Sequence, residues 1–275
     1  YMAQWTIQTA INHFNECKTN RNEAYETLNV RLSLDQKYKK WTQVVDYINL
    51  PVPRESDYLI PQHDTYLTKP VIDISKYKNA SAVQTILQDF SREQVIDMQI
   101  SKQADIVMLL YLLGERFSDK VKKKNLEYYE SKTIHDSSLS MAVHSIVAAN
   151  LGKVDEAYEF FKKAAFIDLG ENMKSSDAGI HAASQGGIWK SIVFGFAGIK
   201  IEETGINIKP ILPKEWNKLV IPIHWRGDQL EVEINSHRVT IENKTGLNPF
   251  IPIKYYGQCY ELRYSLDLRR VSERI

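Results

Sequence analysis

The 275-residue sequence predicts a mainly helical domain followed by a small antiparallel β domain. Up to residue 200, apolar residues recur three and four positions apart, the spacing that places them on one face of a helix. Beyond residue 200 the period falls to two, and residues 230–234 alternate between apolar and acidic side chains. Because runs of helices followed by runs of strands typically form two separate domains, we expect one over residues 1–200 and another over residues 201–275.

The expected helices differ in how much of their surface is apolar. Residues 105–113 are apolar almost all round, which indicates a helix buried between others. Gly152 separates two apolar stripes, so the helices on either side of it are expected to form a helical hairpin. Four prolines interrupt residues 51–70, where we expect packed irregular structure or a functional loop. Periodicity places helices at 5–14, 34–48, 105–113, 139–147 and 154–161.

The expected strands come in quick succession after the helices. Residues 230–234 are the clearest half-buried strand, and residues 239–241 form its expected hairpin partner across Asn235 and Ser236. Turn-forming residues separate the other candidates. These candidates are residues 206–208, 219–225, 251–255 and 260–264.

Composition narrows the class of protein. A hydrophobic content of 43% suits a chain with a substantial core and excludes a disordered or collagen-like one. The 35 Lys and Arg residues nearly cancel the 34 Asp and Glu residues, so no bulk field attracts nucleic acid or an anionic membrane. No stretch approaches the ~18 apolar residues of a membrane-spanning helix. Two widely separated cysteines, Cys17 and Cys259, are typical of reduced thiols, and we expect a cytoplasmic protein.

Two polar segments, residues 101–103 and 133–140, stand directly before expected helices. The first turn of a helix has free backbone N–H groups and the positive end of the helix dipole, so hydroxyls placed there can help to hold an anion. Ser137 and Ser138 are candidates for this role. Ordinary helix capping is the alternative interpretation of the same residues.

A third polar segment, residues 179–189, combines glycines with a histidine. Gly186 and Gly187 permit close backbone approach to a ligand, and His181 supplies a donor whose charge can change near neutral pH. Close helix packing and a structural histidine are the alternatives. The seven histidines show no metal-ligand spacing, and neither a Gly-rich nucleotide-binding loop nor a nucleophile elbow is present, so we expect no metal or cofactor.

Several blocks of sequence carry a resemblance to a known family. They are Lys-Gln-Ala-Asp at 102–105, Tyr-Tyr-Glu at 128–130, His-Asp-Ser-Ser-Leu-Ser at 135–140, Gly-Ile-His-Ala-Ala-Ser at 179–184 and Gly-Phe-Ala-Gly at 195–198. In order and spacing they resemble glycoside hydrolase family 65, which includes the maltose, kojibiose, nigerose and trehalose phosphorylases. The resemblance implies a partial helical-hairpin (α/α) six-barrel over residues 1–200 and a sandwich-like antiparallel β domain over residues 201–275.

The resemblance also implies a reaction, in which an α-linked glucosyl disaccharide and inorganic phosphate give β-glucose 1-phosphate with inversion. It places Lys102 and Gln103 on the sugar. It places around the phosphate a second set of residues, namely Ser137, Ser138, His181, Gly186 and Gly187. Disaccharide and phosphate are therefore the expected partners, and a homodimer is a candidate assembly.

An inverting reaction needs a carboxylic acid to protonate the leaving oxygen. In the family that the chain resembles, this acid is a Glu in a motif expected upstream of Tyr1, so this chain by itself is expected to be inactive. A hydrolase of the same family and a non-catalytic carbohydrate-binding scaffold are the alternatives. Phosphate as nucleophile favours a neutral or cationic group such as His181 over a second carboxylate, because a carboxylate would repel it.

Overall fold

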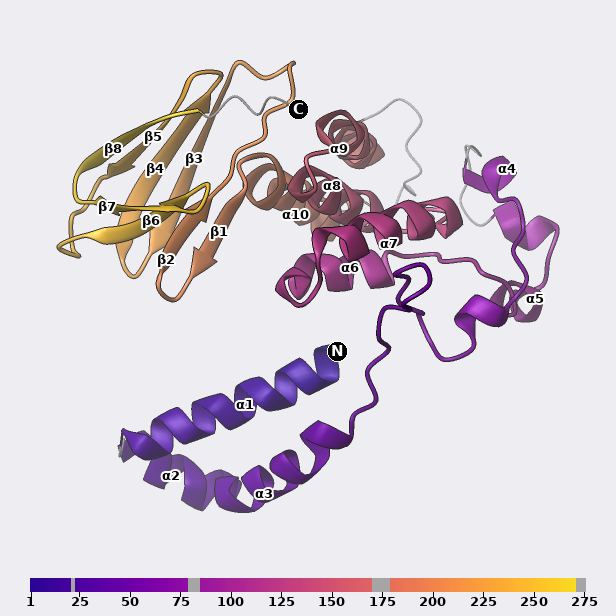
Figure 1. Ribbon diagram of the computed structural model, residues 1–275, viewed down its shortest axis with the longest axis horizontal. Helices are drawn as coiled ribbons and strands as arrows, with labels where there is room; N and C mark the ends of the chain where they lie inside the picture. Colours follow the sequence, from indigo (N-terminus) through magenta and orange to yellow (C-terminus); the bar gives the residue numbers. More distant parts are fainter. Residues whose placement is uncertain (21–22, 79–84, 170–178, 271–275) are drawn as a thin grey trace.

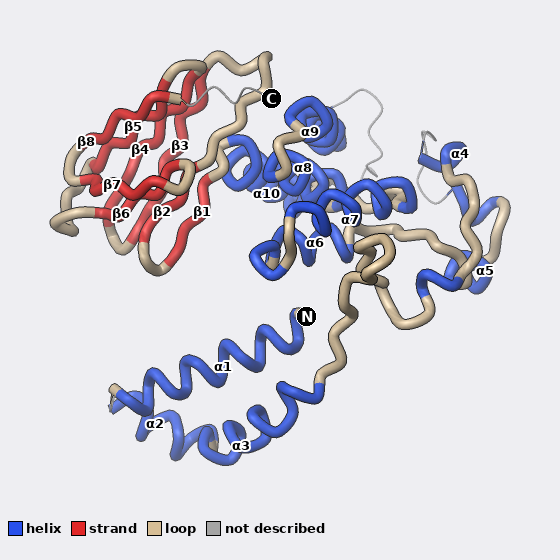
Figure 2. The backbone as a smooth tube through the Cα atoms, in the orientation of Figure 1, coloured by secondary structure: helices blue, strands red, loops and turns tan. Residues whose placement is uncertain are grey.

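A computed structural model describes the whole chain except residues 21–22, 79–84, 170–178 and 271–275 (Figure 1). It confirms the predicted class, with helices first and sheets second (Figure 2). In the described part, no helix is both long enough and apolar enough to cross a membrane. The α-helices are α1 (Met2–Thr19), α2 (Glu23–Leu32), α3 (Leu34–Val44), α4 (Ser75–Lys78), α5 (Arg92–Ile96), α6 (Asp105–Leu112), α7 (Asp119–Lys132), α8 (Ser140–Asn150), α9 (Val154–Leu169) and α10 (Ala182–Lys190).

Helix α8 is the centre of the helical part. Nine of its 11 residues are buried, because it contacts α6, α7, α9 and α10 as well as the π-helix Ser191–Phe196 that continues α10. Small and β-branched apolar side chains make up most of its surface, which lets neighbouring helices approach it from several sides. Because α8 is closely packed, the position of its N-terminal end is fixed by its contacts with the neighbouring helices.

Helices α1, α2 and α3 form a unit to one side of the other helices (Figure 1). Phe14 of α1 stacks on Tyr38 of α3 with the ring centroids 4.3 Å apart. The hydroxyl of Tyr1 donates to the carbonyl of Pro51 over 2.6 Å and ties the start of α1 to the segment that follows α3. Sequence periodicity predicted α1 and α3 but did not single out α2.

The proline-rich segment after α3 is irregular and packed, as predicted. Ile60 and Tyr66 are buried in the same core as α6, α7 and α8. The fully buried Asn125 of α7 holds this segment, because its side-chain oxygen accepts from the Ile60 N–H over 2.8 Å and its amide donates to the Tyr58 carbonyl over 2.7 Å. These bonds supply backbone partners that an irregular buried segment cannot find within itself.

The β part consists of two four-stranded sheets that enclose one apolar core. Among the described strands, all pairs are antiparallel except β2 with β6, which run parallel. The exception has a simple cause: the chain between these two strands builds most of the other sheet, so no tight hairpin fixes their relative direction. The strands are β1 (Ile199–Glu202), β2 (Gly205–Ile208), β3 (Lys218–Trp225), β4 (Asp228–Asn235), β5 (Arg238–Asn243), β6 (Ile251–Tyr255), β7 (Gln258–Leu262) and β8 (Ser265–Arg269).

Aromatic side chains join the helical and β parts. Trp216, in the segment between β2 and β3, packs edge-on against Phe196 of the π-helix and Phe161 of α9, with centroid distances of 4.9 and 5.4 Å. The backbone N–H of Ile211 donates to the Phe196 carbonyl over 2.7 Å in the same region. These contacts bury apolar surface of both parts in one place and hold the parts together.

Candidate functional site

The structure brings the three polar segments together at the N-terminal ends of α6, α8 and α10. A parallel bridge pairs Ser101, before α6, with Thr133, before α8. Its backbone bonds run from the Ser101 N–H to the Lys132 carbonyl and from the Ile134 N–H to the Ser101 carbonyl, over 2.9 and 3.0 Å. On the other side, the buried hydroxyl of Ser184 in α10 donates to the Ser138 carbonyl over 3.0 Å. Segments far apart in sequence therefore form one polar region.

Ser137 and Ser138 differ in what their hydroxyls do. The Ser137 side chain accepts from the Leu139 N–H over 3.4 Å, and its carbonyl accepts from the Ser140 N–H over 3.1 Å. Ser137 therefore closes the turn that leads into α8. The cap position of α8 is Leu139, which makes no side-chain cap bond, and contact of Ser137 with phosphate stays a prediction. The hydroxyl of Ser138 has no hydrogen-bond partner in the described part of the chain, and this half-buried group can bond a ligand.

His181 is oriented by an aspartate that the sequence did not single out. Its Nδ1 lies 2.7 Å from one carboxylate oxygen of Asp168, and its backbone N–H donates to the other over 3.0 Å. The Gln185 side chain donates to that second oxygen over 2.9 Å. With Nδ1–H directed at the carboxylate, Nε2 is the ring nitrogen left for a ligand. About a third of the His181 side chain is exposed, whereas Asp168 is almost covered, at 32% and 4%.

These contacts stabilise the ionised form of Asp168. The hydrogen bond from His181 is the largest cause that lowers its pKa below the ordinary aspartate range, and the bond from Gln185 adds to it. Asp168 lies in the last turn of α9, where the negative end of the helix dipole disfavours a carboxylate. That unfavourable placement is the signal by which sequence reasoning could have found it.

Gly186 and Gly187 lie inside α10, where backbone N–H groups ordinarily bond carbonyls of the preceding turn. A Cβ at Gly187 would lie 2.9 Å from the Cβ of Ala142, so this glycine lets α10 pack closely on α8. A Cβ at Gly186 would have no atom within 4 Å. The structure therefore gives Gly187 the packing role that was the alternative, and contact of either glycine with phosphate stays a prediction.

Lys102 and Gln103 are exposed residues just before α6. Lys102 lines a 250 Å³ cavity together with residues of the irregular segment, including His63 and Tyr66. The side chain of Gln62, on the same cavity, accepts from the Ser101 hydroxyl over 3.2 Å. The cavity is therefore next to the polar region, and a polar ligand held by Lys102 could extend into it.

Taken as a whole, the fold and the site define a two-domain protein whose helical part presents hydroxyl, amide, ammonium and imidazole groups at converging helix ends. The chain belongs to glycosyl hydrolase family 65. Residues 1–190 match the central catalytic domain of that family, and residues 199–262 match its C-terminal domain.

Relatives with named activities cover most of this chain. A kojibiose phosphorylase of Halothermothrix orenii is 43% identical over 242 residues, which are 88% of this chain and 31% of that protein. A kojibiose phosphorylase of Escherichia coli is 46% identical over 187 residues, 68% of this chain and 25% of that protein. A maltose phosphorylase of Bacillus subtilis is 29% identical over 94% of this chain and 34% of that protein. This chain thus spans a quarter to a third of their lengths.

A solved structure supports the assignment of the fold. It is a human-microbiome protein described as a candidate kojibiose phosphorylase, with a TM-score of 0.81 and 28% identity. The match covers 97% of this chain and 35% of that chain.

Proposed function

We propose that this chain is part of a disaccharide phosphorylase and supplies its phosphate site. The observation that carries the proposal is the convergence of Ser138 and His181 at the ends of α8 and α10, joined by the bond from Ser184 to the Ser138 carbonyl. Hydroxyl and imidazole donors at helix N-termini suit an oxyanion. The phosphorylase activities of the relatives agree with phosphate as that anion.

The proposed reaction is an inverting phosphorolysis. Phosphate attacks the anomeric carbon of an α-linked glucosyl disaccharide, the bond to the acceptor oxygen breaks, and β-glucose 1-phosphate forms. His181 would bond phosphate through Nε2 while Asp168 accepts from Nδ1–H. Lys102 and Gln103 would hold the glucosyl group, and Ser137 would hold the bend that presents Ser138.

Protonation of the leaving oxygen requires a carboxylic acid. We propose that a Glu upstream of Tyr1 in the complete protein supplies it, so the present chain binds phosphate without turning over disaccharide. Kojibiose is the first substrate to test, since the two relatives with the highest identities above are kojibiose phosphorylases. Maltose and trehalose follow, because phosphorylases of both sugars are also relatives.

The test uses the complete protein with each disaccharide, with and without phosphate. We expect β-glucose 1-phosphate only when phosphate is present. Release of free glucose at the same rate without phosphate would instead identify a hydrolase of the same family. Absence of any turnover, with sugar binding retained, would favour a carbohydrate-binding scaffold.

A further inference from the structure

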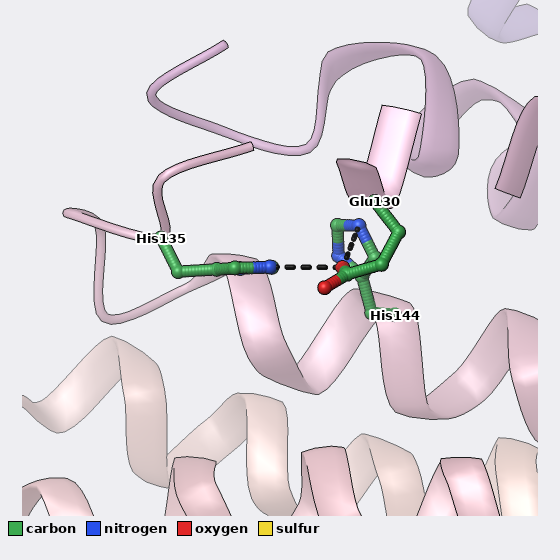
Figure 3. A group of neighbouring side chains, drawn as sticks. All are labelled: Glu130, His135 and His144. Carbon is green, nitrogen blue, oxygen red and sulfur yellow. Dashed lines mark hydrogen bonds and ion pairs between the residues drawn. The ribbon is translucent and has the colours of Figure 1, made fainter. Parts of the chain in front are cut away.

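A buried cluster of one carboxylate and two imidazoles joins α7, the loop that follows it and α8 (Figure 3). Glu130 is in the last turn of α7, His135 is in the connecting loop and His144 is in α8. His135 Nε2 lies 2.9 Å from Glu130 Oε2, and His144 Nε2 lies 3.3 Å from the same oxygen. The histidine side chains are 4% and 0% exposed, so water does not substitute for the bond between His135 and Glu130. In the described part of the chain, His144 Nε2 makes no hydrogen bond.

Ser140, the first residue of α8, is bonded to both imidazoles. His135 Nδ1 lies 2.7 Å from the Ser140 hydroxyl oxygen, and His144 Nδ1 lies 3.0 Å from the Ser140 carbonyl oxygen. The carbonyl can only accept, so His144 carries its proton on Nδ1. Each end of the His135 ring thus has a fixed partner, Glu130 on one side and Ser140 on the other.

A cation already neutralises the carboxylate of this cluster. Lys78 Nζ lies 2.7 Å from Glu130 Oε1 and donates to the Glu130 carbonyl over 2.6 Å. A metal ion placed between Oε2 and the two imidazoles would be repelled by that ammonium. The arrangement therefore favours a hydrogen-bond network over a metal site.

The backbone of His135 explains why a network is needed here. Its φ is 54°, in the left-handed region that residues other than Gly seldom occupy, although Asn, Asp and His do so more often than the rest. The chain turns at this residue and then runs through Asp136 into Ser137 and Ser138 before α8 begins. Such a backbone persists only when its surroundings fix it, and the two ring bonds of His135 do so.

We propose that Glu130 and His135 are positioning residues that fix the Ser137–Ser138 bend in the shape required to bind the anion. This inference rests on the proposed function for the identity of the anion, phosphate, but not for the existence of the bend. It adds to that proposal two residues that act on the anion through the backbone of the bend, Glu130 by way of its bond to His135.

The test is hydrogen exchange of the 275-residue chain, wild type against Glu130→Gln, with Glu127→Gln as the matched control. Glu127 lies on the same helix, is more exposed and pairs with Lys153 away from the bend. Glutamine has one acceptor oxygen for two donors, Lys78 and His135, so one charge-assisted bond is lost. We expect the amides of Leu139 and Ser140 to exchange about 10-fold faster in Glu130→Gln and at the wild-type rate in Glu127→Gln.

A second variant removes the ring bonds of His135 while keeping a residue that can adopt the same backbone conformation. His135→Asn keeps a residue that tolerates the left-handed region but is too short to reach Glu130. It should accelerate the same amides while those in the middle of α8 keep their wild-type rates. Equal acceleration throughout α8, or unchanged rates at the bend in both variants, would overturn the proposal, because either result means that Glu130 supports the fold in general or not at all.

A phosphate titration distinguishes this inference from the proposed function. Millimolar phosphate should slow exchange at the bend in the wild type, and the midpoint should rise about 10-fold in Glu130→Gln. A wild type that phosphate does not protect would refute the proposed phosphate site. The experiment without phosphate would still decide whether Glu130 positions the bend.

Discussion

Replacing Asp168 with asparagine tests whether Asp168 orients the His181 imidazole for binding an anion. Three donors face the carboxylate: the His181 N–H, its Nδ1–H and the Gln185 amide. Asparagine has the same shape but one acceptor oxygen, and its NH₂ group would point at a donor. At least one charge-assisted bond is lost, and the imidazole no longer has a fixed tautomer. We expect phosphate to bind about 10-fold more weakly, the factor for roughly one such bond at a partly exposed site.

The assay is titration of the chain with phosphate, followed by the phosphate KM of the complete protein. Asp155→Asn is the matched control, since Asp155 is an exposed aspartate in the first turn of the same helix, α9. We expect Asp155→Asn to bind phosphate as the wild type does. Equal phosphate affinities for Asp168→Asn and the wild type would refute the argument that Asp168 prepares His181.

Three further perturbations test packing, titration and the β part. Gly187→Ala should destabilise the chain to urea by about 1–3 kcal/mol through overpacking against α8, whereas Gly186→Ala should be neutral or stabilising by up to about 1 kcal/mol. Burial lowers the pKa of His144 to about 4. Burial alone would raise the pKa of Glu130, but the hydrogen bond from His135 helps to lower that pKa to about 2. Both groups bind fewer protons when folded, so urea midpoints should fall as the pH drops from about 6.5 towards 4 for the first group and from about 4.5 towards 2 for the second. Asp228→Ala should cost about 3 kcal/mol in the same assay, because the fully buried carboxylate accepts four hydrogen bonds around one turn.

Much of the fold was predictable because its causes are local. Alternation of apolar and acidic residues predicted β4, where Leu230, Val232 and Ile234 are all buried. The almost wholly apolar stretch 105–113 predicted the buried helix α6. The parallel pairing of β2 with β6 could not be predicted, because both directions bury the same side chains and local sequence does not choose between them.

The site was predictable only in part, for a similar reason. Local composition singled out Ser138 and His181, since hydroxyls and an imidazole exceed what one helix cap needs. The partners that orient them are distant in sequence: Ser184 lies 46 residues from Ser138, and Asp168 lies 13 residues from His181. A single sequence can mark Asp168 as unusual at the end of its helix, but it does not say which distant residue is its partner. Ser137 shows that a hydroxyl singled out by composition can also close the turn before a helix, and its contact with phosphate stays a prediction.

The bond from Ser184 to the Ser138 carbonyl has a consequence for the speed of binding. This bond joins α10 to the segment before α8, and the Ser184 side chain that makes it has no exposed surface. The N-terminal ends of α8 and α10, which would hold the anion, therefore keep a fixed separation. The conformational entropy of bringing these two helix ends together is thus lost once, during folding, and not at each encounter with a ligand. Anion exchange at this site should then proceed without a slow rearrangement step, at a rate governed by diffusion and dissociation.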